Sequence, residues 1–119
     1  MLYNICKSNE IEENFMKVFT LDKNIDVLVG RKNGKLFAFN NMCPHKGASL
    51  SKGELINDKI ICYMHGYEYN IFNGKLENMK SWKKDINWKE QNINWRKSKD
   101  LELYSILEEN GHIYIKIEN

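Results

Sequence analysis

The sequence predicts an all-β fold, and three observations support this. Asn-Gly pairs occur at 33–34, 73–74 and 110–111, and this pair is favoured in two-residue hairpin turns because both central residues need positive φ. Short runs rich in β-branched and aromatic residues flank the pairs. No apolar pattern with a long helical period runs through the 119 residues.

The expected strands alternate with short polar connections along the whole chain. They are 2–7, 15–21, 25–29, 36–39, 59–61, 67–72, 104–108 and 112–117. Residues 8–14 read as a polar connection with room for one helical turn, and residues 22–24 and Gly53 mark turns. His112 stands alone after a turn, and we interpret it as an ordinary strand residue.

The composition is that of one domain, residues 1–119, without a specialised surface. A net charge of +2 with 29% charged residues does not mark a nucleic-acid binder. Neither a signal peptide nor a transmembrane segment is recognisable. Three cysteines are typical of a reducing compartment. We therefore expect a soluble, cytoplasmic protein in which Cys6 is a small buried residue of the first strand.

Two short segments each contain one cysteine and one histidine. The first box is Cys43-Pro44-His45-Lys46-Gly47-Ala48-Ser49-Leu50, and the second is Cys62-Tyr63-Met64-His65-Gly66-Tyr67. Zinc fingers usually place two cysteines in one half and two histidines in the other, so this arrangement favours a site that separates the two ligand types. In a Rieske [2Fe–2S] centre, two thiolates bind one iron and two imidazoles the other.

The two boxes resemble the Rieske ferredoxin family. The shared pattern is C-P-H-x-G-A-x-L, then Gly53, C-x-x-H-G-x-x-[FY] and the Asn-Gly pair at 73–74. The resemblance is strong over residues 43–76 and weaker over most of the chain outside about 77–100. It implies the Rieske iron-sulfur fold, with an antiparallel β-sandwich or barrel as a base and a small cluster-binding subdomain of two loops at about 40–76.

The same resemblance implies one [2Fe–2S] cluster and a set of four ligands. Cys43 and Cys62 would bind one iron as thiolates, and His45 and His65 would bind the outer iron as neutral imidazoles. Gly47 and Gly66 suit a close approach of the backbone to the inorganic sulfides.

The loops differ from the respiratory Rieske proteins in one way and from the common family pattern in another. Respiratory Rieske proteins join their loops by a disulfide, and the corresponding positions here are Ala48 and Met64, so we expect no such bond. Tyr63 stands where the family often has proline, so Pro44, the only proline, alone stiffens the loops.

The residues after the second histidine bear on the reduction potential. Respiratory centres have a serine after the His-Gly pair, and a tyrosine hydroxyl that also donates to the cluster. Here Tyr67 follows Gly66, so we expect fewer donors. We therefore expect a low potential, in the lower part of the roughly −150 to +300 mV range of Rieske centres.

Residues 77–100 do not fit the family outline, and they include all three tryptophans, Trp82, Trp88 and Trp95. Ile-Asn-Trp followed by a basic residue occurs twice, at 86–89 and 93–96. Three interpretations stay open for this insertion. It forms an extra hairpin that packs its tryptophans on the sheet, it docks a redox partner, or it binds single-stranded nucleic acid.

The expected function is one-electron transfer rather than catalysis. The family resemblance implies that the protein takes electrons from a flavin-containing reductase and passes them to a terminal oxygenase. No Ser/His/Asp set, Cys/His catalytic set or phosphate-binding glycine loop is visible. Two alternatives remain, the small subunit of an NAD(P)H nitrite reductase and a zinc-stabilised β module that binds a partner.

Overall fold

The computed structural model describes residues 2–21, 24–44, 48–63, 66–79 and 100–117. Within these ranges the chain forms β-strands and two short 3₁₀ helices, η1 (Ser8–Glu10) and η3 (Leu50–Lys52). The strands are β1 (Leu2–Lys7), β2 (Met16–Leu21), β3 (Ile25–Lys32), β4 (Lys35–Asn40), β5 (Glu54–Ile56), β6 (Lys59–Ile61), β7 (Tyr67–Asn70), β8 (Leu76–Met79), β9 (Ser105–Glu109) and β10 (His112–Lys116). The predicted all-β class is confirmed.

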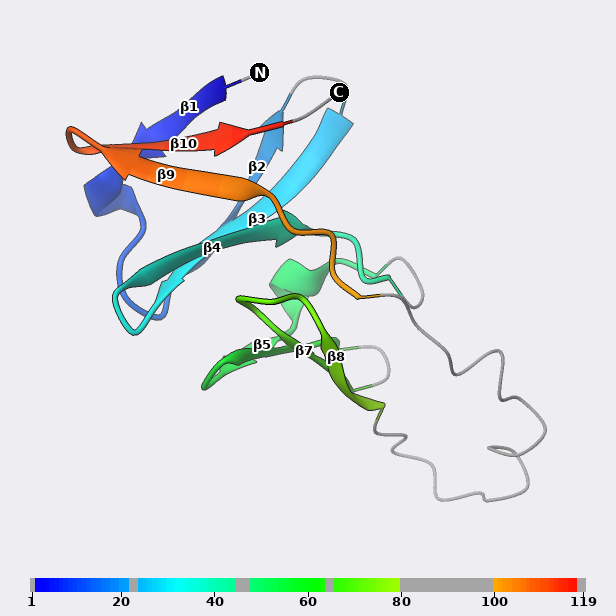
Figure 1. Cartoon of the computed structure of the whole chain (residues 1–119). Coiled ribbons are helices and arrows are strands. Elements are labelled where there is room, and N and C mark those ends of the chain that lie inside the picture. Colours follow the sequence, from blue (N-terminus) through cyan, green and yellow to red (C-terminus); the bar gives the residue numbers. More distant parts are fainter. Residues whose placement is uncertain (1, 22–23, 45–47, 64–65, 80–99, 118–119) are drawn as a thin grey trace, which may run out of the picture.

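The strands form three antiparallel sheets. Their orders are β1-β10-β9, β2-β3-β4 and β5-β6-β7-β8, and the β2-β3-β4 sheet lies between the other two (Figure 1). No helix in the described part of the chain is long and apolar enough to cross a membrane.

Both faces of the middle sheet are covered, because alternate residues of β3 enter different cores. Val27 and Val29 pack with Ile113 and Ile115 of β10, whereas Leu28 between them packs against the β5–β8 side. A strand that is buried on both faces needs apolar residues at consecutive positions, which explains the run from Val27 to Val29. We call the two cores the base core and the loop core.

The base core contains Cys6, as the sequence predicts. Its side chain is 9% exposed and packs with the apolar residues of β3 and β10. Burial raises the pKa of this thiol, so Cys6 stays protonated and poorly nucleophilic at neutral pH. Cys6 is therefore a packing residue.

Two of the three Asn-Gly pairs form the predicted hairpin turns. Asn33 and Gly34 have φ values of 54° and 75°, and Asn110 and Gly111 have 52° and 78°. Both pairs join adjacent antiparallel strands directly.

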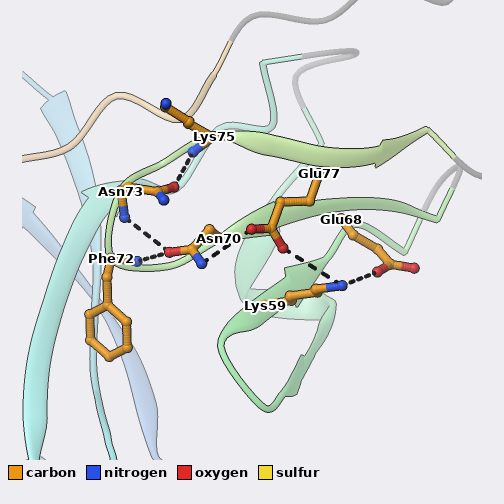
Figure 2. Close-up of polar contacts among 7 residues, drawn as sticks. All are labelled: Lys59, Glu68, Asn70, Phe72, Asn73, Lys75 and Glu77. Atoms are coloured by element: carbon orange, nitrogen blue, oxygen red, sulfur yellow. Dashed lines mark hydrogen bonds and ion pairs between the residues drawn. The ribbon is translucent and has the colours of Figure 1, made fainter.

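The third Asn-Gly pair does not form a two-residue turn, and here the prediction was wrong. β7 ends at Asn70 rather than at residue 72, and residues 71–75 connect it to β8. The Asn70 side chain causes this end, because its Oδ1 accepts hydrogen bonds from the backbone N–H groups of Phe72 (2.8 Å) and Asn73 (3.0 Å) (Figure 2). A side chain that satisfies backbone donors in this way favours a turn over continued strand pairing.

β5 and β8 were not predicted. β5 has only three residues, and its hairpin with β6 turns at Asn57-Asp58, where Asn57 takes a φ of 53° without a following glycine. β8 begins at Leu76, so it includes the first residues of the predicted insertion 77–100. Residues 80–99, with the three tryptophans, lie outside the described residues.

The segment 100–104 forms backbone hydrogen bonds both to the β7–β8 connection and to β4. Leu101 N–H donates to the Gly74 carbonyl (2.7 Å), and Tyr104 N–H donates to the Ala38 carbonyl of β4 (3.0 Å). Asn40 N–H also donates to the Glu102 carbonyl (2.8 Å). The chain thus runs beside β4 on its way from the β5–β8 sheet to β9.

Candidate metal centre

The first cysteine–histidine box follows β4 and is closed at its base by backbone pairing. Cys43 N–H donates to the Ala48 carbonyl (2.7 Å), and Leu50 N–H donates to the Asn41 carbonyl (2.7 Å). A β-bridge pairs Met42 with Ser49 between these two bonds. The described ends of the box, at Cys43 and Ala48, are therefore held side by side by a short ladder.

The second box is the connection between β6 and β7. Cys62 N–H donates to the Tyr67 carbonyl (2.9 Å), and Gly66 N–H donates to the Cys62 carbonyl (2.9 Å). Gly66 has a φ of 71°, which a residue with a side chain adopts only at a cost. The glycine at this position is thus required by the loop's own backbone.

Both candidate cysteine ligands are buried in the loop core. Cys43 and Cys62 are each 1% exposed, belong to the same cluster of buried side chains, and form no disulfide. The fold therefore brings together the two thiols that the sequence places 19 positions apart. His45 and His65, the other two predicted ligands, lie outside the described residues, as do Gly47 and Met64.

A tyrosine hydroxyl contacts one of these cysteines. Tyr69 lies on β7, is fully buried, and its hydroxyl oxygen is 3.5 Å from the Cys43 sulfur. A thiolate has no hydrogen, so with Cys43 ionised the hydroxyl is the donor and stabilises the negative sulfur. The expectation of fewer hydrogen-bond donors to the cluster did not include the Tyr69 hydroxyl. In the sequence, the aromatic residue that ends the C-x-x-H-G-x-x-[FY] pattern could have indicated this donor.

The face of β7 opposite the two tyrosines contains a carboxylate that is paired with a lysine. Glu68, between the two inward-facing tyrosines, is 8% exposed, and its carboxylate is 3.4 Å from the Lys59 ammonium. Glu77 of β8 lies 3.6 Å from the same ammonium (Figure 2). Because a buried carboxylate is costly unless paired, Lys59 stabilises the strand that leaves the second loop.

Gly53 lets the end of the first loop pack closely on β6. A Cβ at this position would overlap the carbonyl oxygen of Ile61, the residue just before Cys62. The φ of Gly53 is −85°, which any residue can adopt, so the glycine serves close packing. The sequence indicated a turn here, and the structure supplies this different reason for the glycine.

The candidate site lies close to the molecular surface. Tyr63, directly after the buried Cys62, is 52% exposed, and Met42, directly before the buried Cys43, is 61% exposed. Each thiol is therefore shielded from water while one of its neighbours in the chain reaches solvent. Such an arrangement suits a redox group that exchanges electrons with another protein.

The chemistry of the described residues fits one half of a Rieske site. Two buried thiols in one cluster can bind an iron as thiolates, and a hydroxyl is placed to compensate the resulting negative charge.

The model of the family described as "Rieske [2Fe-2S] domain" matches residues 1–98. Among curated proteins, the chain is 36% identical over 73 residues to apoptosis-inducing factor 3 of Homo sapiens, a match that covers 61% of this chain and 12% of that protein. It is also 27% identical over 73 residues to the ferredoxin component of the alkene monooxygenase system of Xanthobacter autotrophicus. That match covers 60% of this chain and 59% of the relative, so the chain spans less than two thirds of either relative's length.

A solved structure extends the likeness to the whole fold. The ferredoxin of carbazole 1,9a-dioxygenase from Nocardioides aromaticivorans superposes with a TM-score of 0.78 over 99% of both chains, at 15% sequence identity. At this identity the likeness concerns the fold alone, and it confirms the Rieske fold that the two boxes predicted. With a family model that matches most of its length, the chain belongs to the Rieske [2Fe-2S] domain family, whose members carry one [2Fe–2S] cluster.

Proposed function

We propose that this protein is a one-electron carrier, a Rieske ferredoxin that takes electrons from a flavin-containing reductase and passes them to a terminal oxygenase. The observation that carries the proposal is the pairing of two buried cysteines with exposed neighbours on the same loops, Tyr63 and Met42. The likeness to ferredoxin components of a monooxygenase and a dioxygenase system supports the choice of acceptor.

We further propose that Cys43, Cys62, His45 and His65 hold the cluster. When bound, the cluster supplies reversible one-electron chemistry. The chain's own residues exclude water from the two sulfurs, and the Tyr69 hydroxyl stabilises charge on the Cys43 sulfur. None of the three cysteines forms a disulfide in the structure, which supports the proposal of a cytoplasmic location.

The ligand assignment is tested by exchanging ligand types. His45→Cys and His65→Cys should each move the absorption and EPR spectra toward those of an all-cysteine cluster, because a thiolate replaces an imidazole. His112→Cys is the matched control, since His112 is a half-buried residue of β10 in the other half of the molecule. Unchanged spectra in the His45 and His65 variants would refute the assignment.

The carrier function is tested with the whole protein and candidate partners. The protein should show a rhombic EPR signal on reduction, and it should carry electrons from a flavin-containing reductase to a Rieske-type terminal oxygenase in a reconstituted assay. Stable co-purification with a large sirohaem-containing protein would instead identify a nitrite reductase subunit. A colourless protein that contains zinc would refute any redox function.

A further inference from the structure

The side chain of Asn41 joins both ends of the first loop. Its Oδ1 accepts a hydrogen bond from the Ser51 backbone N–H (2.9 Å), and its Nδ2 donates to the Ser49 hydroxyl oxygen (2.7 Å). The two serine hydroxyls lie 2.8 Å apart, which closes a ring of hydrogen bonds. Asn41 itself is 8% exposed. A nearly buried amide is thus bonded to residues just beyond the loop.

The backbone of Asn41 anchors this ring to the middle sheet. Asn41 N–H donates to the Asp26 carbonyl of β3 (2.9 Å), and the Asn41 carbonyl accepts from Leu50 N–H (2.7 Å). Asn41 also stands two residues before Cys43 in the chain. A single residue therefore connects the rigid sheet, the start of the loop and the return of the loop at 49–51.

From these contacts we infer that Asn41 is a positioning residue, which holds the two described ends of the first loop so that Cys43 meets the cluster in the geometry that binds it. The inference deepens the proposed function and rests on the assignment of Cys43 as a ligand. Asn41 does not touch the reacting group; it acts through the loop.

The bonding pattern explains why this position needs an amide. The side-chain oxygen must accept a hydrogen bond from a main-chain N–H, and the side-chain nitrogen must donate one to a hydroxyl. Asparagine is the only residue that offers both groups on so short a side chain. An alanine would leave the Ser51 N–H and the Ser49 hydroxyl without these partners. A surface hollow of about 340 Å³, lined by Asn41, Met42 and Ser49 among others, would let water replace the lost amide. We therefore expect Asn41→Ala to fold, with a looser first loop.

The chain offers a matched control in Asn70. Its Oδ1 likewise accepts from two backbone N–H groups, but it ends β7 opposite Lys59, at the end of the hairpin away from Cys62. Asn70→Ala should therefore destabilise the fold without altering the first loop. Comparing the two variants separates loss of stability from loss of positioning.

The experiment measures three quantities on the cluster-loaded wild type, Asn41→Ala and Asn70→Ala. These are the thermal unfolding midpoint, the rate of cluster loss to a chelator, and the hydrogen-exchange rate of the Ser51 amide. We expect the chelator to remove the cluster about tenfold faster from Asn41→Ala than from Asn70→Ala, since two hydrogen bonds that order the loop are lost. The Ser51 amide should exchange faster only in Asn41→Ala, and the g values of the reduced cluster should shift only there.

Equal cluster lifetimes and g values in the two variants would overturn the inference, because Asn41 would then be a stabilising residue only. If Asn41→Ala does not fold, Ser49→Ala removes the acceptor for Nδ2 together with the contact to the Ser51 hydroxyl, and it leaves the Ser51 N–H bond to Oδ1 in place. An unchanged cluster lifetime in that variant would have the same meaning. Failure of the proposed function is distinguishable, because the wild-type protein would then show no rhombic signal at all.

Discussion

The contact between the Tyr69 hydroxyl and the Cys43 sulfur joins the strand after the second loop to a proposed ligand of the first loop. Tyr69 belongs to the strand that follows the second box, and Cys43 starts the first box. Reduction adds negative charge to the cluster, and a donor to one of its thiolates stabilises the reduced state more than the oxidised state. Tyr69 thus acts on the potential as well as on packing.

Tyr69→Phe removes only the hydroxyl, and we expect the midpoint potential to fall by an amount on the order of tens of millivolts. A tenfold change in a one-electron equilibrium corresponds to about 59 mV, and loss of one charge-assisted hydrogen bond is of this order. A redox titration followed by circular dichroism measures the change. Tyr63→Phe, at the exposed residue beside Cys62, should leave the potential unchanged. An unchanged potential in Tyr69→Phe would show that this hydroxyl does not donate to the sulfur.

The residue identities that carry chemistry were predictable, whereas the packing partners were not. Cys43 and Cys62 stood out because each lies in a box with a histidine and a glycine, and Cys6 was predicted to be buried because of its place in a strand. Tyr69 is marked as an aromatic by the end of the second pattern, but nothing in that pattern names Cys43 as its partner, and Asn41 is an ordinary amide in the sequence. The contacts of these two residues with Cys43 and Ser51 depend on how separate segments meet.

Among the elements, the hairpins show where a local signal is sufficient. Asn33-Gly34 and Asn110-Gly111 form the predicted turns because their own φ preferences agree with the twist of adjacent strands. At Asn73-Gly74 the side chain of Asn70 intervenes and ends the strand earlier. At Asn57 the tertiary pairing of β5 with β6 imposes positive φ without a glycine. The Asn-Gly pattern therefore did not predict the effect of the Asn70 side chain, and it did not predict the three-residue strand β5.

Gly53→Ala tests whether the close packing of Gly53 against Ile61 positions the two loops. The new Cβ would overlap the Ile61 carbonyl oxygen, so η3 and the end of β6 must separate and Cys62 must move. We expect a loss of about 1–3 kcal/mol in unfolding free energy together with faster loss of the cluster. Chelator-induced bleaching and chemical denaturation measure the two effects.

Gly34→Ala is the control for this prediction. Gly34 has a φ of 75° and no heavy atom near its would-be Cβ, so alanine adds backbone strain of about 1–2 kcal/mol far from the loops. The control should lose stability to a similar degree and keep its cluster. If both variants lose the cluster at the same rate, close packing at Gly53 has no special role.

On the scale of the whole molecule, charged groups link distant segments beside the base core. The Arg31 guanidinium of β3 donates to both carboxylate oxygens of Glu108 on β9 (2.9 and 3.4 Å) and to the Ile11 carbonyl (2.9 Å). Glu13 accepts from the backbone N–H groups of Asn33 and Gly34. The N–H of Gly34, then that of Asn33, lowers the pKa of Glu13, and the Arg31 hydrogen bond lowers the pKa of Glu108.

These lowered pKa values predict sensitivity to acid. A carboxylate whose pKa is lower in the folded state stabilises the fold above its unfolded pKa, about 4.3 for glutamate. That contribution disappears as the pH falls through the folded-state value. Glu13→Gln should therefore lower the denaturation midpoint at pH 7, and its deficit should shrink below about pH 4. Glu12→Gln, at an adjacent exposed residue, should show no such change, and a deficit that persists in acid would contradict the assignment.

The exposed surface beside the two loops predicts where a redox partner binds. Tyr63 is 52% exposed next to a buried ligand cysteine, and large aromatic side chains are frequent anchors of protein interfaces. We expect Tyr63→Ser to slow second-order electron transfer to the oxygenase about tenfold without changing the potential. Ile56→Ser, at a 45% exposed residue of β5, is the control in the same stopped-flow assay. Equal rates for wild type and Tyr63→Ser would place the contact elsewhere.

Neighbouring residues of β3 pack in different cores, and this has a consequence for how the sequence can evolve. Leu28 serves the loop core and Val29 the base core, although they are adjacent in the chain. Mutations that adjust robustness can therefore accumulate on one side of the strand while the redox properties drift on the other. Two selective pressures act on one short chain with little mutual interference, and a single strand is the boundary between them.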